Sequence, residues 1–156
     1  MNQSKFEHII KENEQELPVK ELLKRNFGFS TRLMTRLKVN DLVHLNGSPV
    51  KMYQKGNPGD RITVFLPKEK SEFEPENIPI SVVYEDDDLL IINKQPGYVV
   101  HPTKGHPCHT MANGIMNYML SQQKHYKIRF INRLDMDTSG LLAVAKNSHC
   151  QDDMSK

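Results

Sequence analysis

The sequence predicts an α+β protein made of two small domains. Apolar residues recur at helical spacing between residues 19 and 37, and alternating apolar residues flank an Asn-Gly pair at positions 46 and 47. The second half contains several apolar stretches of strand length, of which 89–92 and 141–145 are the longest. With 156 residues, 37% apolar and 26% charged, the composition is globular and excludes a large multidomain protein.

A polar stretch marks the predicted domain boundary. Residues 68–77 read KEKSEFEPEN, which is acidic and shows neither helical nor strand periodicity. This composition is typical of a linker. We therefore expect one domain over residues 1–67 and a second over residues 78–156.

The first domain is predicted to run helix, helix, hairpin, strand. Gly28 ends the first helix, and Ser30 is suited to cap the second because its hydroxyl can accept from an unpaired backbone N–H. Asn46-Gly47 is a strong hairpin signal because both residues tolerate positive φ, and 61–66 reads as a strand. The positions expected to face inward from the two helices are Val19, Leu22, Leu23, Phe27, Leu33, Met34 and Leu37.

Positive charge is concentrated in this first domain. Residues 20–55 contain eight Lys or Arg against two acidic residues, although the whole chain carries a net charge of only +2. Arg32 and Arg36 are four residues apart and so lie on one face of the second helix. Such a cluster can be a solvated cationic face or a site for nucleic-acid phosphates, and charge alone does not separate the two.

The pattern VHLNGSPV followed by GDRI, after two helices, resembles the S4-type RNA-binding domain over roughly residues 17–67. The resemblance implies RNA contact through the second helix and the hairpin. Carried over to this chain, it implies phosphate contacts from Ser30, Arg32, Arg36 and Lys38.

The second domain is predicted to begin with two strands, 81–84 and 89–93, around an acidic turn. We expect the second of them to be buried on both faces, because it is almost wholly apolar. Thr110 is suited to cap a helix that runs to about Gln122. Two further apolar stretches, 129–134 and 141–145, complete a mainly antiparallel sheet with helices.

Residues 132–146, NRLDMDTSGLLAVAK, resemble the catalytic motif of the RluA-type pseudouridine synthases. VYEDDDLLIINK and GYVVHP, earlier in the chain, resemble the opening strands of the same family, and an S4-type domain before the catalytic core also occurs there. The resemblance implies isomerisation of uridine to pseudouridine in structured RNA, most simply ribosomal RNA, on a base flipped out of its stack. It assigns Asp135 as the catalytic carboxylate. Arg133 would lie beside Asp135, keep it ionised and help to hold the nucleotide.

Two departures from the family pattern change what we expect. Asn132 stands where the family usually has His, and the chain ends at Lys156 whereas family members continue. We therefore expect a truncated chain whose catalytic sheet is incomplete, with an exposed edge and too few partners to bury residues 89–92 and 141–145. The alternative function is then a non-catalytic RNA-binding protein or an inactive synthase fragment.

The remaining expectations concern partners and location. His101, His106, Cys108 and His109 suggest zinc, but their spacing fits no known zinc pattern, so we expect neither metal nor cofactor. No apolar run approaches the ~20 residues of a membrane span. The polar amino terminus and the two cysteines, read as reduced, favour the cytoplasm. We expect a monomer whose partner is RNA.

Overall fold

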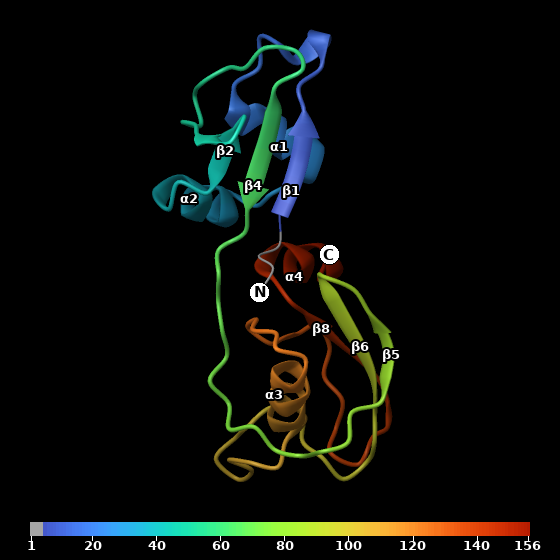
Figure 1. Ribbon diagram of the computed structural model, residues 1–156. Helices are drawn as coiled ribbons and strands as arrows, with labels where there is room; N and C mark the ends of the chain where they lie inside the picture. Colours follow the sequence, from blue (N-terminus) through green and yellow to red (C-terminus); the bar gives the residue numbers. More distant parts are fainter. Residues whose placement is uncertain (1–4) are drawn as a thin grey trace. The chain divides into compact units, whose positions relative to one another are not determined.

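The computed structural model describes residues 5–156, which form two compact units divided after Lys68 (Figure 1). Each unit has its own cluster of buried apolar side chains. No helix in the described part of the chain is long and apolar enough to cross a membrane.

The first unit packs two helices against a four-stranded antiparallel sheet of order β1-β4-β2-β3. All seven apolar positions expected to face inward contribute to its core, six of them buried and Phe27 partly so. Its elements are β1 (Lys5–Ile9), the short 3-10 helix η1 (Glu12–Glu14), α1 (Val19–Phe27), α2 (Thr31–Val39), β2 (Val43–Leu45), β3 (Ser48–Pro49) and β4 (Arg61–Phe65).

Local signals in the sequence set the boundaries of these helices and of the hairpin. Gly28 ends α1 in the left-handed region at φ 65°, and the Ser30 hydroxyl accepts from Leu33 N at 3.2 Å to cap α2. Asn46 and Gly47 both have positive φ, at 51° and 88°, as a two-residue hairpin turn requires. The predicted helix ends and hairpin turn are therefore confirmed.

The strand β1 was not expected from the sequence. It pairs antiparallel with β4 over all five residues and so becomes the edge of the sheet. Its burial alternates between exposed and half-buried, because only one face lies on the core. Polar residues lie on the outward face of β1, Lys5 and Glu7 among them. They weaken the apolar pattern from which a strand is predicted.

The second unit packs α3 against a four-stranded antiparallel sheet of order β5-β6-β8-β7 (Figure 1). The Thr110 hydroxyl caps α3 as predicted, accepting from Asn113 N. A short carboxy-terminal helix was not expected. The elements of this unit are β5 (Val82–Glu85), β6 (Leu89–Lys94), α3 (Met111–Ser121), β7 (Arg129–Phe130), β8 (Gly140–Ala145) and α4 (Ser148–Met154).

The sheet of the second unit is covered on one face, which corrects two expectations. Leu90, Ile92, Leu142 and Val144 are fully buried against apolar side chains of α3, so this part of the chain does bury its strands. The prediction that β6 is buried on both faces is wrong, because burial alternates along it. On the other face Leu141 remains 58% exposed.

Residues 69–77, expected to form part of a linker, have no helix or strand but pack along the second unit. Ser71 Oγ accepts from Ile128 N at 2.7 Å, and Asn113 Nδ2 donates to Glu74 O at 2.9 Å. Glu69 pairs with the buried Arg129. These contacts use polar side chains and backbone groups, which is why a polar sequence can be fixed in place here.

Candidate active site

The loop between β7 and β8 carries the family-like motif, and Asn132 closes its base. The Asn132 side chain donates from Nδ2 to Leu141 O at 3.0 Å and accepts at Oδ1 from Ala143 N at 2.9 Å. A neutral amide that both donates and accepts is suited to pairing with a strand backbone. Asn132 therefore anchors the start of the loop to β8.

Asp135 begins a tight turn in this loop. Thr138 N donates to Asp135 O at 3.0 Å, and Gly97 N donates to Met136 O at 2.8 Å. The Asp135 side chain is exposed, and no hydrogen bond within residues 5–156 involves its carboxylate. The backbone of the turn is fixed while the acid faces solvent.

Lys94, the last residue of β6, binds the turn from inside the unit. Its Nζ donates to the carbonyl oxygens of Asp135 at 3.1 Å, Met136 at 3.0 Å and Thr138 at 2.8 Å, and to Gln95 O at 3.1 Å. The residue is 0% exposed. A buried ammonium is tolerated only with such a set of acceptors. Lys94 thus holds the loop that presents Asp135.

The electrostatics at Lys94 reflect this burial. Desolvation lowers the pKa of the Lys94 ammonium, while the negative charges of Asp137 and Asp135 oppose that shift. Lys94 was not expected from the sequence to belong to the site. A lysine that ends an apolar strand is the signal that could have found it, because Lys94 lies two residues after Ile92 and four after Leu90, on the same buried face of β6.

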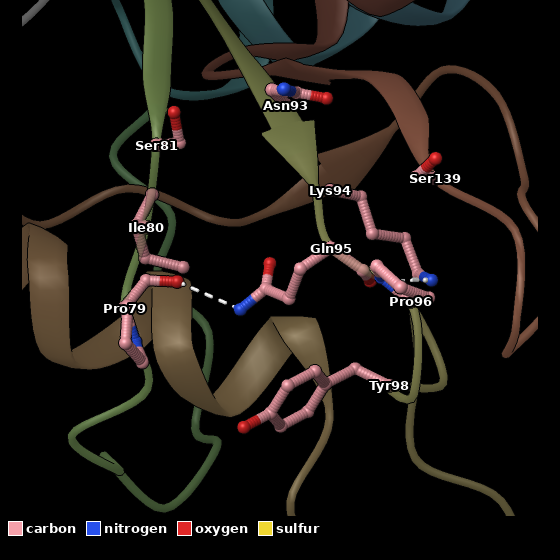
Figure 2. Close-up of a pocket in the computed structure, with 9 residues that line it drawn as sticks. All are labelled: Pro79, Ile80, Ser81, Asn93, Lys94, Gln95, Pro96, Tyr98 and Ser139. Carbon is pink, nitrogen blue, oxygen red and sulfur yellow. Dashed lines mark hydrogen bonds between the residues drawn. The ribbon is translucent and has the colours of Figure 1, made fainter.

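A shallow hollow lies beside the turn and is lined by Lys94, Ser139, Gln95 and Tyr98, with Pro79–Ser81 on its far side (Figure 2). Gln95 Nε2 donates to Pro79 O at 3.0 Å across it. Asp135 is not among the lining residues. We therefore take the surface around Asp135, rather than this hollow, as the reactive part of the site.

Arg133 is two residues before Asp135, but the structure does not bring the two side chains into contact. Arg133 is exposed, and no ion pair of the described residues includes it or Asp135. The role expected for Arg133 beside the acid stays a prediction about the RNA-bound protein.

The phosphate contacts predicted in the first unit all lie on α2 or at its start. Ser30 caps the helix with its hydroxyl, so its first role is structural. Arg32 and Lys38 are exposed, and Arg36 is half-buried. The helix therefore presents at least two cations to solvent.

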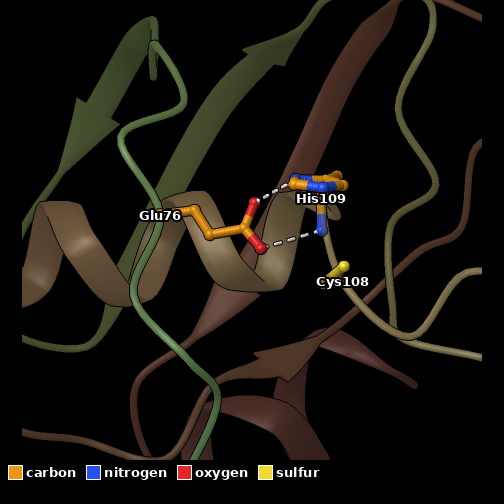
Figure 3. Close-up of side chains that lie close together, drawn as sticks. All are labelled: Glu76, Cys108 and His109. Carbon is orange, nitrogen blue, oxygen red and sulfur yellow. Dashed lines mark hydrogen bonds and ion pairs between the residues drawn. The ribbon is translucent and has the colours of Figure 1, made fainter.

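The four candidate zinc ligands do not come together. Only Cys108 and His109 lie in one cluster, joined by Glu76 (Figure 3). The Glu76 carboxylate accepts from His109 N at 3.0 Å and lies 2.7 Å from His109 Nδ1. His101 instead packs on Phe73, with ring centroids 5.3 Å apart. Because both Glu76 oxygens already bind His109, we assign this cluster a role in fixing the loop before α3.

Comparison with known proteins identifies the family to which the part of the chain that carries this loop belongs. Residues 88–156 match the family model described as RNA pseudouridylate synthase. This part of the chain belongs to the RNA pseudouridylate synthase family. The match includes Lys94, Arg133 and Asp135, so the expected resemblance to RluA-type synthases is confirmed for the second unit.

Similar synthases are found in distant bacteria. The chain is 42% identical over 122 residues to ribosomal large subunit pseudouridine synthase D of Haemophilus ducreyi, covering 75% of this chain and 38% of that protein. It is 41% identical over 109 residues to the RNA pseudouridine synthase YlyB of Bacillus subtilis, covering 67% and 36%. An RNA pseudouridine synthase of Aquifex aeolicus is 32% identical over 142 residues, covering 88% and 45%. The chain spans less than half the length of each of these synthases.

Proposed function

We propose that this protein isomerises uridine to pseudouridine in ribosomal RNA, with Asp135 as the catalytic carboxylate. One observation carries the proposal: within the family match, an exposed acid is presented on a turn whose backbone is bound by a buried lysine. Catalytic groups work best when their supporting structure is rigid. The names of the similar synthases support ribosomal RNA as the substrate.

The reaction explains why an acid is needed. The bond between C1′ of the ribose and N1 of the base breaks, and a bond between C1′ and C5 of the same base forms. N1 gains a proton and C5 loses one, so no redox step or cofactor is involved. A carboxylate can act as a nucleophile on the sugar or the ring, or as the base that removes a ribose proton so that a glycal-like species forms and later returns it.

The exposure of Asp135 supports access by a flipped nucleotide. A base in a helical stack cannot reach a carboxylate, so the uridine must leave the stack. The Asp135 carboxylate makes no hydrogen bond to any residue that the structure describes, so it is available to the incoming nucleoside. Arg133, exposed on the same loop, would then meet a phosphate or ribose of that nucleotide.

We further propose that the first unit is an S4-type RNA-binding domain and that Ser30, Arg32, Arg36 and Lys38 contact RNA phosphates. The order of its two helices, hairpin and strand supports this assignment. We also propose that the chain acts as a cytoplasmic monomer. Cys108 and Cys150, both free thiols in the structure, agree with a reducing compartment.

A tritium-release assay tests the proposal. Ribosomal RNA labelled at uridine C5 loses tritium to water when pseudouridine forms, because C5 gives up its hydrogen. Filter binding of the same RNA measures affinity alone. Turnover supports the synthase, whereas tight binding without tritium release supports the alternative of a non-catalytic RNA-binding protein.

A further inference from the structure

A groove on the first unit is not used by the proposed mechanism. It lies between the start of α1, the end of α2 and residues 50–55, and its floor is formed by the buried Leu37, Val43 and Met52. Its volume of about 630 Å³ is typical of small-ligand sites, which span roughly 300–1,000 Å³. We call it the Tyr53 groove.

Tyr53 projects from a fixed turn at this groove. The side chain is 78% exposed, and it makes no hydrogen bond among residues 5–156. The turn itself is bound to the start of α1, with Lys20 N donating to Met52 O at 2.9 Å and Val19 N donating to Gln54 O at 2.8 Å. Gln54 Oε1 also accepts from Lys51 N at 2.7 Å. An aromatic ring is therefore held out to solvent on a rigid support.

The rim of the groove is strongly basic. Lys20, Lys38, Lys51 and Lys55 all line it, against the single acid Asp41. Lys51 is paired with Asp41 at 3.8 Å and Lys55 with Glu16 at 3.5 Å, but these pairs are exposed and therefore weak. Within the described residues Lys20 and Lys38 have no ion pair. The excess of positive charge at the rim favours binding of a polyanion in the groove.

From this juxtaposition we propose that the Tyr53 groove binds a single-stranded segment of the RNA, with one base stacked on Tyr53 and its phosphates near Lys20 and Lys38. Aromatic platforms flanked by cations are how proteins hold unpaired nucleotides without reading sequence. A neutral or basic peptide would match the apolar floor but not the basic rim. The proposal rests on RNA being the substrate, and it adds a base-stacking contact to the phosphate contacts proposed for α2.

Fluorescence gives a direct test, because the chain contains no Trp. Tyr53→Trp places the only indole in the groove, and Tyr84→Trp places one on an exposed strand of the second unit as the control. Titration with oligouridylate should quench emission from residue 53 and leave emission from residue 84 unchanged. Emission at residue 53 that is unaffected by saturating oligouridylate would overturn the proposal.

Affinity provides the second readout. Tyr53→Ala should weaken oligouridylate binding by about 5-fold to 100-fold, whereas Tyr53→Phe, which keeps the ring, should stay within about twofold. Equal affinity for all three proteins would contradict stacking. Tritium release from ribosomal RNA separates this proposal from the proposed function: turnover without quenching overturns the groove alone, and quenching without turnover overturns the synthase alone.

Discussion

Lys94 and Asp135 are 41 residues apart in the sequence, yet the Lys94 ammonium donates to the Asp135 carbonyl at 3.1 Å. Two more carbonyls of the same turn accept from that ammonium. The end of β6 thereby fixes the loop between β7 and β8. The position of the proposed catalytic acid depends on a residue that touches only its backbone.

Replacing this lysine should destabilise the turn and reduce activity. In Lys94→Met the carbonyls of Asp135, Met136 and Thr138 lose their donor, which should lower the free energy of unfolding by about 3 kcal/mol. Urea unfolding measures the loss, and tritium release should fall with it. Lys127→Met, at an exposed lysine of the same unit, should change neither. If Lys94→Met were as stable as wild type, the turn would not depend on its hydrogen bonds from Lys94.

The packing of residues 69–80 against α3 predicts an effect at a helix glycine. A Cβ added at Gly114 would lie 2.9 Å from Ile78 Cβ, closer than real Cβ contacts, and 3.1 Å from Ile80 Cδ1, which is tighter than most of them. Gly114→Ala should therefore destabilise the unit by about 1–3 kcal/mol despite the better helix propensity of alanine. Gly105→Ala, where nothing lies within 4 Å, is the matched control. A more stable Gly114→Ala protein would mean that this segment is easily displaced.

The stability of the second unit should fall in acid partly through Glu85. Burial raises the pKa of this carboxyl, but hydrogen bonds from Lys146 at 2.8 Å and Tyr118 at 2.6 Å outweigh burial and leave the pKa lowered. A lowered folded-state pKa means that the stabilisation is present above the ordinary value of 4.5 and is lost as pH falls through the folded-state value.

A pH series of thermal unfolding checks this contribution. Glu85→Gln should be less stable than wild type at pH 7, because it leaves the buried Lys146 ammonium without its partner. The difference should shrink as the pH falls through the lowered folded-state pKa of Glu85. Glu72→Gln, at an exposed side chain, controls for the loss of one negative charge. A difference that is constant with pH would exclude titration of Glu85 as the cause.

RNA binding by the first unit should depend on salt through α2. Arg32→Ala combined with Arg36→Ala should weaken affinity and reduce the slope of log affinity against log salt by roughly one unit for each phosphate that is no longer bound. Arg25→Ala, whose side chain pairs with Glu21 on α1, serves as the control. An unchanged slope in the double variant would show that these arginines are only solvated.

Helix caps and turns could be predicted from the sequence, whereas contacts between residues far apart in the chain could be seen only in the structure. The caps at Ser30 and Thr110 and the Asn46-Gly47 turn depend on neighbouring residues, so they could be read directly. The hydrogen bonds from Lys94 to the Asp135 turn could not be predicted, because they form only when β6 pairs with β8. The burial of Leu142 by apolar side chains of α3 could not be predicted either, because it depends on how the helix packs on the sheet.

The central claim, that Asp135 performs the chemistry, is tested most directly by two amide substitutions in one turn. Asp135→Asn should abolish tritium release from C5-labelled ribosomal RNA while affinity stays within about twofold, because the amide has the same shape but cannot act as nucleophile or base. Asp137→Asn, two residues on and also exposed, should retain turnover. Substantial turnover by Asp135→Asn, or equal loss in both variants, would contradict the assignment.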